Sequence, residues 1–335
     1  MRQMLCLLLT LLLTACLLAG CEKEDTAPVP VPTVAETQPT TEGPEETTVP
    51  ETVETYPAAQ LNTRVLLDSD PALRQDYLLL AVDQDGPFLA QDVKLNHRGA
   101  DALTQWLMSA DSRELIGDFG LDTYGDTLFH LSDEALCYIG SISRSTAATA
   151  TVRLAVDETL ADTGLVDTLI PQFEKATGYT VEIRTGTVTN VLSAARNGYV
   201  DLVLVKSGDQ AQALVDDGFV RTVSGFSEPQ IPLLAMPYLL CGPMDDPAGV
   251  KICATAKAAF AAIARKEWTF VSRGDGSFVH SLEQQFWPEG TDFGKWYISA
   301  DMDMGPCLVM NDLEGGYILT DKLTWLIFAQ ENGII

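Results

Sequence analysis

The feature of this chain that most constrains its fold is a regular alternation of short apolar segments with longer amphipathic ones between residues 151 and 218. The apolar segments at 151–156, 180–185 and 201–205 have the length and composition of buried strands. Each is followed by a segment whose apolar residues recur at helical spacing and which ends at a glycine. This repeat predicts an α/β fold, with mostly parallel sheets covered by helices on both faces.

The same kind of pattern extends over the rest of the folded part. The helix after the first strand is expected to begin near Asp162, a good N-cap, and to place Leu165, Leu169 and Phe173 on one face. Further strands are predicted at 77–82, 127–131, 236–241 and 269–272. Further helices are predicted at 99–109, 111–118, 189–197, 209–217, 255–267, 277–287, 305–314 and 321–331.

Charge and composition exclude several classes of protein. The formal net charge of −26 argues against a nucleic-acid partner, which needs a basic surface. A single long apolar run, at the N-terminus, argues against a multi-pass membrane protein. His97, His130 and His280 are too widely spaced for a zinc site, and no metal or cofactor is predicted. The spacing of the cysteines in the folded part shows no metal motif and leaves their pairing open: Cys137, Cys241, Cys253 and Cys307.

The N-terminal segment, residues 1–20, has the features of a lipoprotein signal peptide. Arg2 supplies positive charge, a Leu-rich apolar run follows, and small residues precede Cys21. The sequence L-L-A-G-C resembles the lipobox of bacterial lipoproteins, in which the cysteine takes the lipid. We therefore expect Cys21 to anchor the protein to the lipid bilayer of the cell membrane, facing outside the cytoplasm. An ordinary signal peptide, or a membrane-spanning anchor with an incidental cysteine, is the alternative.

Residues 21–56 are expected to form a linker after the lipidated cysteine. They are rich in Pro, Thr and acidic residues and show no apolar periodicity. Such a segment cannot bury enough apolar surface to offset the entropy lost on ordering. It is therefore predicted to be an extended, disordered tether between the membrane and the folded part.

A family resemblance rests on motifs within residues 150–335. The segment 152–178 resembles the opening of the tungstate-binding proteins of ABC transporters, a branch of the periplasmic-binding-protein superfamily. The match continues in colinear order through D-L-V-L-V (201–205), V-D-D-G-F (215–219), G-P-M-D-D-P-A-G-V (242–250), F-V-S-R-G-D-G-S (270–277) and Y-I-L-T-D (317–321). The resemblance implies a two-lobed, type II binding-protein fold with its lobes joined near 220–236. It also implies a small oxyanion-like ligand in the interlobe cleft, an ABC permease as partner, and no enzymatic activity.

Residues 61–149 resemble the part with which the same family ends. The segment 68–82 is similar to a strand of the family's C-terminal part, and 102–120 is similar to its closing helices. Each family segment thus occurs once, in rotated order, which predicts a circular permutation. Such a rearrangement is allowed where the parent's termini lie close together at the surface. A separate small N-terminal α/β domain is the alternative.

Candidate binding residues follow from the expected fold, because ligands of open α/β sheets bind beyond the carboxyl ends of the strands. Arg273 lies between a predicted strand and a predicted helix, where its guanidinium can clamp an oxyanion through two hydrogen bonds. Ser272 and Ser277 flank it and can donate hydroxyl hydrogen bonds. A structural salt bridge between Arg273 and Asp275 is the alternative.

The end of the first strand departs from the family pattern. Where the family has T-T-T-S, this chain has V-D-E-T at 156–159. Thr159 and, after the second strand, Thr187 remain candidate ligands, whereas Asp157 and Glu158 place negative charge where an oxyanion would bind. One like charge at about 4 Å costs on the order of 4 kcal/mol at an effective dielectric constant of about 20. The departures predict a changed ligand, such as an amine-bearing solute that these acids would recognise, or no ligand.

Two classes of function remain open from the sequence. The first is a membrane-anchored solute-binding lipoprotein that serves an ABC importer. The second is a non-transport derivative of the same fold that acts as a surface sensor or adhesion module. An enzyme is not expected, because Ser277 and His280 are accompanied by no orienting acid and no nucleophile-turn motif.

Overall fold

The computed structural model describes residues 61–90, 92–146 and 150–333. The predicted signal peptide, Cys21 and the predicted linker lie outside these residues. Within the described part, no helix combines the length and the apolar character that crossing a membrane requires.

Two sheets are present in the described residues. The larger has nine strands, and its main path runs β1-β8-β2-β6-β4-β5, with β3 and β11 also paired to β8 and β7 paired to β2. Its strands are β1 (Thr63–Leu67), β2 (Arg74–Val82), β3 (His130–Leu131), β4 (Thr151–Asp157), β5 (Thr180–Gly186), β6 (Leu202–Lys206), β7 (Val220–Arg221), β8 (Gln230–Pro243) and β11 (Ile318–Asp321). The smaller sheet pairs β9 (Phe270–Ser272) with β10 (Tyr297–Ser299).

Most of the described helices lie close to the predicted ranges, but the two four-residue helices, at 121–124 and 158–161, were not predicted, and one N-cap is corrected. The helices are α1 (His97–Leu107), α2 (Ala110–Gly117), α3 (Leu121–Tyr124), α4 (Glu158–Ala161), α5 (Leu165–Thr177), α6 (Val188–Arg196), α7 (Asp209–Asp216), α8 (Ala256–Lys266), α9 (Phe278–Gln284), α10 (Met304–Glu314) and α11 (Lys322–Glu331). The expected N-cap at Asp162 is wrong, because that residue follows α4 as its C-cap. Gly164, at a φ of 79°, begins α5 instead, since glycine adopts this left-handed backbone without strain.

The large sheet is mixed rather than mostly parallel. β4 is parallel to both neighbours, β5 and β6, as the strand–helix repeat predicts. The two long strands β2 and β8 run antiparallel to their partners, and β2 separates β6 from β8. The apolar pattern predicts which residues are buried in a strand, but it does not specify the strand's direction.

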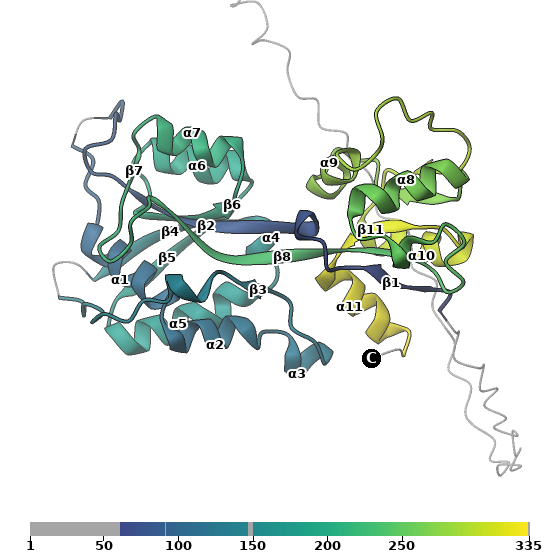
Figure 1. Ribbon diagram of the computed structural model, residues 1–335. Coiled ribbons are helices and arrows are strands. Elements are labelled where there is room, and N and C mark those ends of the chain that lie inside the picture. Colours follow the sequence, from purple (N-terminus) through teal and green to yellow (C-terminus); the bar gives the residue numbers. More distant parts are fainter. Residues whose placement is uncertain (1–60, 91, 147–149, 334–335) are drawn as a thin grey trace, which may run out of the picture. The chain divides into compact units, whose positions relative to one another are not determined.

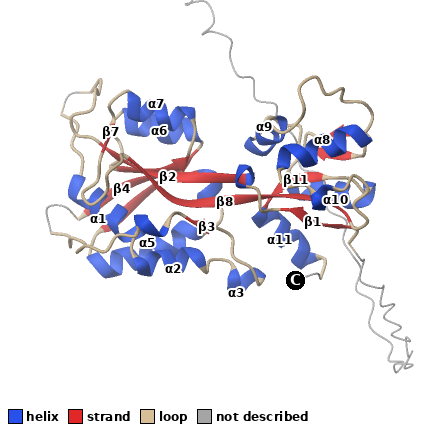
Figure 2. Cartoon of the chain, viewed as in Figure 1, coloured by secondary structure: helices blue, strands red, loops and turns tan. Residues whose placement is uncertain are grey.

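Helices cover both faces of the sheet around β2, β4, β5 and β6, which we call the first lobe (Figure 2). Apolar residues of α6 and α7 pack with Leu78, Leu80 and Val82 of β2. The intervening residues of the same strand, Tyr77 and Leu79, belong to the core shared with α1, α2 and α5. This alternation is the period-two pattern of a strand buried on both faces, and it confirms the prediction of helices on both sides.

A second lobe is built from β1, β11, β9 and β10 with helices α8 to α11 (Figure 1). Strand β8 belongs to both lobes, because its residues up to Pro237 pair with β2 and those from Tyr238 pair with β11. The chain also passes between the lobes at residues 67–74, from β1 to β2. The lobes are therefore joined by two segments. The β8 crossing at Pro237–Tyr238 lies just after the predicted junction near 220–236, and the crossing at 67–74 was not predicted.

The N-terminal part of the described chain is not separate from the rest. Strand β1 pairs with β8 in the second lobe, and β2 pairs with β6 and β8. Helix α1 packs against α5 and β4. The described residues belong to one compact unit, so the segment that resembles the end of the family shares its sheet and its core with the segment that resembles the beginning.

Candidate functional site

A pocket of about 550 Å³ lies where the carboxyl ends of β4, β5 and β6 face the loop that follows β9. Both lobes contribute to it. Its lining residues are Asp157, Glu158, Thr159, Thr187, Val188, Thr189, Lys206, Tyr238, Arg273, Gly276, Ser277, Phe278, Val279 and Asp321. The volume lies in the range of small-molecule sites.

The first-lobe side of the pocket is built from strand ends that become helix caps. Asp157 ends β4, and its carboxylate accepts a hydrogen bond of 3.1 Å from the backbone N–H of Thr159. Thr187 follows β5, and its hydroxyl accepts one of 3.4 Å from the N–H of Asn190 at the start of α6. Short polar side chains are favoured at such caps because they satisfy otherwise unpaired N–H groups.

The second-lobe side is the loop between β9 and α9. Ser277 caps α9 and accepts a hydrogen bond of 3.4 Å from the N–H of His280. Gly274 has a φ of 70°, and a Cβ built there would lie 2.1 Å from Oγ of Ser299. The tight turn therefore requires glycine at this position, and it holds Arg273 and Ser277 at the pocket.

Six of the seven predicted ligand residues line this one pocket. They are Asp157, Glu158, Thr159, Thr187, Arg273 and Ser277. Ser272 does not line it, because its side chain is buried beneath the loop, with 1% of the residue exposed. Its hydroxyl accepts a hydrogen bond of 3.2 Å from the N–H of Gly274, so its contact is with the loop that carries Arg273.

Ser272 is also linked to a buried carboxyl group, Glu283 of α9. Glu283 accepts hydrogen bonds from Nε1 of Trp287 at 3.0 Å and from the hydroxyl of Tyr297 at 2.8 Å. Burial raises the pKa of Glu283, against the opposing effect of the hydrogen bonds from Ser272, Trp287 and Tyr297. This network supports the β9–α9 loop from the side away from the pocket.

Arg273 is paired with two carboxylates of its own lobe. Its Nε lies 2.6 Å from Oδ2 of Asp275, and one terminal nitrogen lies 3.1 Å from Oδ1 of Asp303. The salt bridge with Asp275, which the sequence left as the alternative, is therefore present. Burial alone would raise the pKa of Asp275, but hydrogen bonds from Ser277 and the charge of Arg273 hold it below its usual value.

Lys206 at the end of β6 is a pocket residue that the sequence analysis missed. Its Nζ donates a hydrogen bond of 2.9 Å to Oγ1 of Thr159 and lies 3.6 Å from Oδ1 of Asp157. It also lies 5.1 Å from the centroid of the Phe278 ring, which belongs to the other lobe. The rule that ligands bind beyond strand ends would have found this residue, because it directly follows the apolar run 201–205.

Tyr238 and Tyr77 lie close to the acidic side of the pocket. Burial, followed by the charges of Asp321 and Asp157, raises the pKa of Tyr238. Tyr77 is fully buried, and its pKa is raised by burial first and then by Asp157, Tyr238 and Asp321. Its hydroxyl has no hydrogen-bond partner among the described residues. A buried hydroxyl without a partner is costly in a native fold, and this one is electrostatically coupled to three residues of the pocket.

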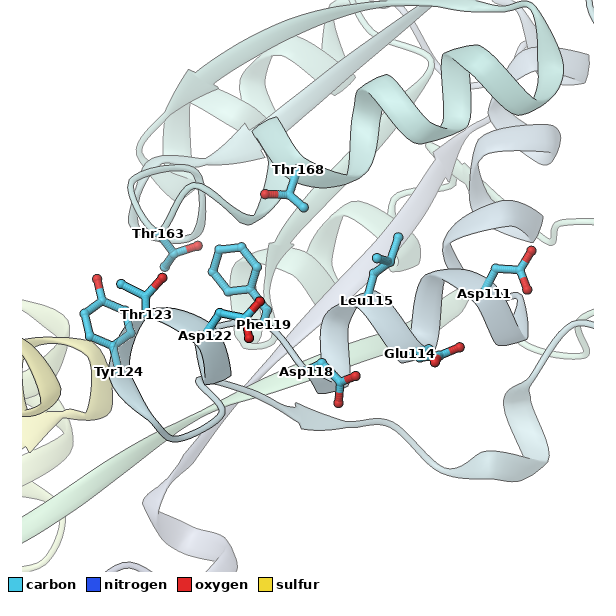
Figure 3. A pocket seen from close by; sticks show the side chains of 11 residues that line it. Asp111, Glu114, Leu115, Asp118, Phe119, Asp122, Thr123, Tyr124, Thr163 and Thr168 are labelled. Atoms are coloured by element: carbon cyan, nitrogen blue, oxygen red, sulfur yellow. The ribbon is translucent and has the colours of Figure 1, made fainter. Parts of the chain in front are cut away.

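A second hollow, of about 620 Å³, is formed mainly by α2 and α3 and contains none of the predicted ligand residues (Figure 3). It is rimmed by acidic side chains of the two helices: Asp111, Glu114, Asp118 and Asp122. Across the described residues, no group of three or more His, Cys, Asp or Glu side chains is arranged to hold a metal ion. The described cysteines form no disulfide, and Cys241 is a buried thiol.

The chain matches a known protein family over more than half of its length. Residues 142–333 match the model of the PBP superfamily domain. The chain belongs to the PBP superfamily. The α/β fold expected from the resemblance is thereby confirmed, and the pocket lies at the carboxyl ends of strands, where ligands of α/β sheets bind.

Two curated relatives in the PBP superfamily match over much of the same length. A Haloferax volcanii protein whose name describes an anion-binding protein of an ABC transporter is 32% identical over 199 residues, 58% of this chain and 55% of that protein. The tungstate-binding protein TupA of Peptoclostridium acidaminophilum is 29% identical over 195 residues, 56% of this chain and 65% of that protein. This chain thus spans less than two thirds of the length of each.

Among solved structures, the tungstate-binding protein TupA from Desulfovibrio alaskensis G20 is 31% identical, with a TM-score of 0.46. The match covers 55% of this chain and 72% of that one. The resemblance to tungstate-binding proteins, which the motifs indicated, is confirmed by the curated relatives. The names of the two curated relatives describe binding proteins rather than enzymes, in agreement with the expectation that this chain is not an enzyme.

Proposed function

We propose that this protein captures a small solute in the pocket between its lobes and delivers it to the permease of an ABC importer. The observation that carries the proposal is the pocket itself, which gathers the ends of three parallel strands from one lobe and the Arg273 loop from the other. Ligands of α/β folds bind at this position. The relatives are named as binding proteins of ABC transporters, which supports the same role.

The solute carries an anionic, oxyanion-like group that meets the cationic and hydroxyl side chains of the pocket. Arg273 and Lys206 supply positive charge from opposite lobes. Hydroxyl groups that can donate hydrogen bonds stand beside them at Thr159, Thr187 and Ser277. A ligand held from both sides would stabilise the closed arrangement of the lobes, which is how binding energy can be coupled to delivery.

A thermal-shift screen of the full chain tests the capture of a solute. Probes are tungstate, molybdate, sulfate, phosphate, amino acids, short carboxylates and amines. A ligand present at about a hundredfold above its Kd stabilises the fold by about 2.7 kcal/mol, which raises the Tm by roughly 5 °C. Arg273→Ala should abolish this shift, whereas Arg184→Ala, at an exposed arginine of β5, should not. If no probe shifts the wild type, the surface sensor or adhesion role replaces transport.

Lipid anchoring through Cys21 is part of the proposed function. It rests on the sequence L-L-A-G-C and the apolar run before it. We expect the wild-type protein to partition into the detergent phase of a membrane extract and Cys21→Ala to move to the aqueous phase, because the acyl chains provide the anchor. Retention of Cys21→Ala in the detergent phase would show that another anchor holds the protein.

A further inference from the structure

The pocket lining has an excess of negative charge. Three carboxylates line it, those of Asp157, Glu158 and Asp321, against the two cations of Lys206 and Arg273. A dianion placed there would meet this excess directly. One uncompensated like charge at about 4 Å lowers affinity on the order of a thousandfold at an effective dielectric constant of about 20.

Both cations of the pocket already have anionic partners within the protein. Lys206 faces the buried carboxylate of Asp157, and Arg273 is paired with Asp275 and Asp303. Each can still share its positive charge with one anionic group of a ligand, because a guanidinium and an ammonium have several donors. The two of them do not provide the uncompensated positive charge that a tetrahedral dianion such as tungstate needs.

The pocket also contains carboxylates that could pair with a cationic group of a ligand. Glu158 is exposed and makes no ion pair among the described residues. Asp321 accepts hydrogen bonds from the N–H and the hydroxyl of Thr324 but pairs with no described cation. The described acids do not form a metal site, so a cation that meets them is an organic amine rather than a metal ion.

A buried tyrosine on β2 shares a sheet face with Lys206. The hydroxyl of Tyr77 lacks a hydrogen-bond partner among the described residues, although Tyr77 is fully buried. Tyr77 lies opposite Lys206 in the pairing of β2 with β6, so the two side chains project from the same face of the sheet. Tyr77 does not itself line the pocket, so a ligand is recognised by the charged lining residues rather than by this hydroxyl.

Building on the proposed function, we infer that the solute is a small zwitterion, with one anionic group and one amino group, and not a tetrahedral dianion. Its anionic group is held by Lys206, Arg273 and Ser277, and its amino group by Glu158 and Asp321. The anionic group of the ligand then faces the cationic side chains of the pocket, and its amino group faces the carboxylates.

Calorimetric titration of the full chain with matched probes tests this inference. Each zwitterion is compared with the same molecule lacking the amino group: alanine with propionate, taurine with ethanesulfonate, and 2-aminoethylphosphonate with ethylphosphonate. Ethylamine, which each of the three becomes when its acid is removed, is the acid-free partner of all of them. Tungstate and molybdate complete the set. We expect at least one zwitterion to bind at least tenfold more tightly than both of its partners and than either dianion, since each ion pair contributes about this factor.

Replacement of one acid separates the charge effect from structural damage. Glu158→Gln should weaken binding of the zwitterion roughly tenfold and should strengthen binding of molybdate, because one carboxylate is removed. Glu182→Gln, at an exposed carboxylate on β5, should change neither. Loss of fold would weaken both ligands together and could not produce opposite changes.

The outcomes distinguish the inference from the function on which it rests. Tighter binding of tungstate or molybdate than of every zwitterion would overturn the zwitterion inference and leave solute capture standing. Tightest binding of an amine without an acid would do the same. No heat from any probe would overturn the proposed function and the inference with it.

Discussion

Lys206 shows how one side chain sets the electrostatics of the pocket. It ends a strand of four buried residues, and its own side chain is 11% exposed. Its Nζ is shared between Asp157, which is 2% exposed, and the hydroxyl of Thr159. A buried carboxylate without a cation would be strongly unfavourable. The positive charge of Lys206 therefore stabilises the buried, ionised Asp157 in the pocket lining.

Removal of Lys206 should therefore destabilise the fold through Asp157. We expect Lys206→Met to lower the free energy of unfolding by about 2 kcal/mol, because the carboxylate then keeps only its hydrogen bond from Thr159. Lys206→Met combined with Asp157→Asn should lose clearly less than the sum of the two single variants. Urea denaturation of the four proteins measures the coupling, and additive losses would show that the two side chains do not act as a pair.

Glu283 gives a pH dependence whose sign can be worked out. Burial raises its folded-state pKa above the unfolded value of about 4.3. Between these two pKa values the folded protein holds a proton that the unfolded chain has lost, so stability falls as pH rises through that window. Glu283→Gln lacks this dependence. Urea denaturation between pH 4 and 7 should show wild type losing stability relative to the variant as pH rises; a constant difference would contradict the raised pKa.

At the residue scale, the sequence predicted the polar residues that follow strands. Asp157, Thr187 and Ser277 could be found because capping residues at strand-to-helix junctions also line the site. Tyr238, which also lines the pocket, could not, since it lies within an apolar run and has the pattern of a core residue. Ser272 was placed in the site because the sequence does not reveal that the last residue of β9 points into the core.

At the scale of elements, Asp70 links residues 67–74, where the chain passes between the lobes, to helix α8 of the second lobe. It caps the short helix Pro71–Leu73, and one carboxylate oxygen accepts a hydrogen bond of 3.0 Å from the N–H of Ala72. The other oxygen accepts one of 2.6 Å from the N–H of Ala256, the first residue of α8. The turn that leads into β2 is thereby fixed to a helix 186 residues further along the chain.

The loss of this link should cost stability. We expect Asp70→Ala to reduce the free energy of unfolding by about 1–2 kcal/mol, because two backbone N–H groups lose their acceptor. Asp68→Ala, at an exposed aspartate two residues away, should change it by less than about 0.5 kcal/mol. Equal effects of the two substitutions in thermal or urea denaturation would show that the carboxylate of Asp70 has no special role.

Strand lengths and directions were the least predictable features among the elements. Only 236–241 was predicted for β8, which runs from Gln230 to Pro243. Pro232, Pro237 and Pro243 lie in this strand, and proline lacks the N–H that a central strand donates. The strand tolerates them partly through a shift in register against β2, opposite Tyr77 and Leu78. Helix positions were more accurate, because helical periodicity extends over more residues.

At the scale of the whole molecule, the order of the segments is unusual. β2, near the start of the described chain, is inserted between β6 and β8, and α1 packs on α5 of the matched superfamily region. The family match begins at residue 142, although the sheet already includes strands from residue 63. We propose that the chain is a circular permutation, in which residues 61–149 complete the fold that residues 150–335 begin.

A shortened chain tests this dependence. A protein that begins at Val152 lacks β1, β2 and β3, so β6 and β8 lose the strand that joins them. We expect it to aggregate or to unfold without cooperativity, since apolar faces of the sheet would be exposed. A single sharp urea transition by circular dichroism, as for a protein with its own complete core, would show that the N-terminal segment is a separate domain.

Hydrogen exchange measured by mass spectrometry, with and without the tightest-binding probe, tests most directly that the pocket between the lobes is the ligand site. The account predicts slower exchange in two separate parts of the chain at once, residues 157–160 and 187–190 of the first lobe and residues 273–280 of the second. The hollow at residues 111–124, which is rimmed by acids (Figure 3), should exchange at an unchanged rate. Protection confined to residues 111–124, or to one lobe only, would contradict binding between the lobes.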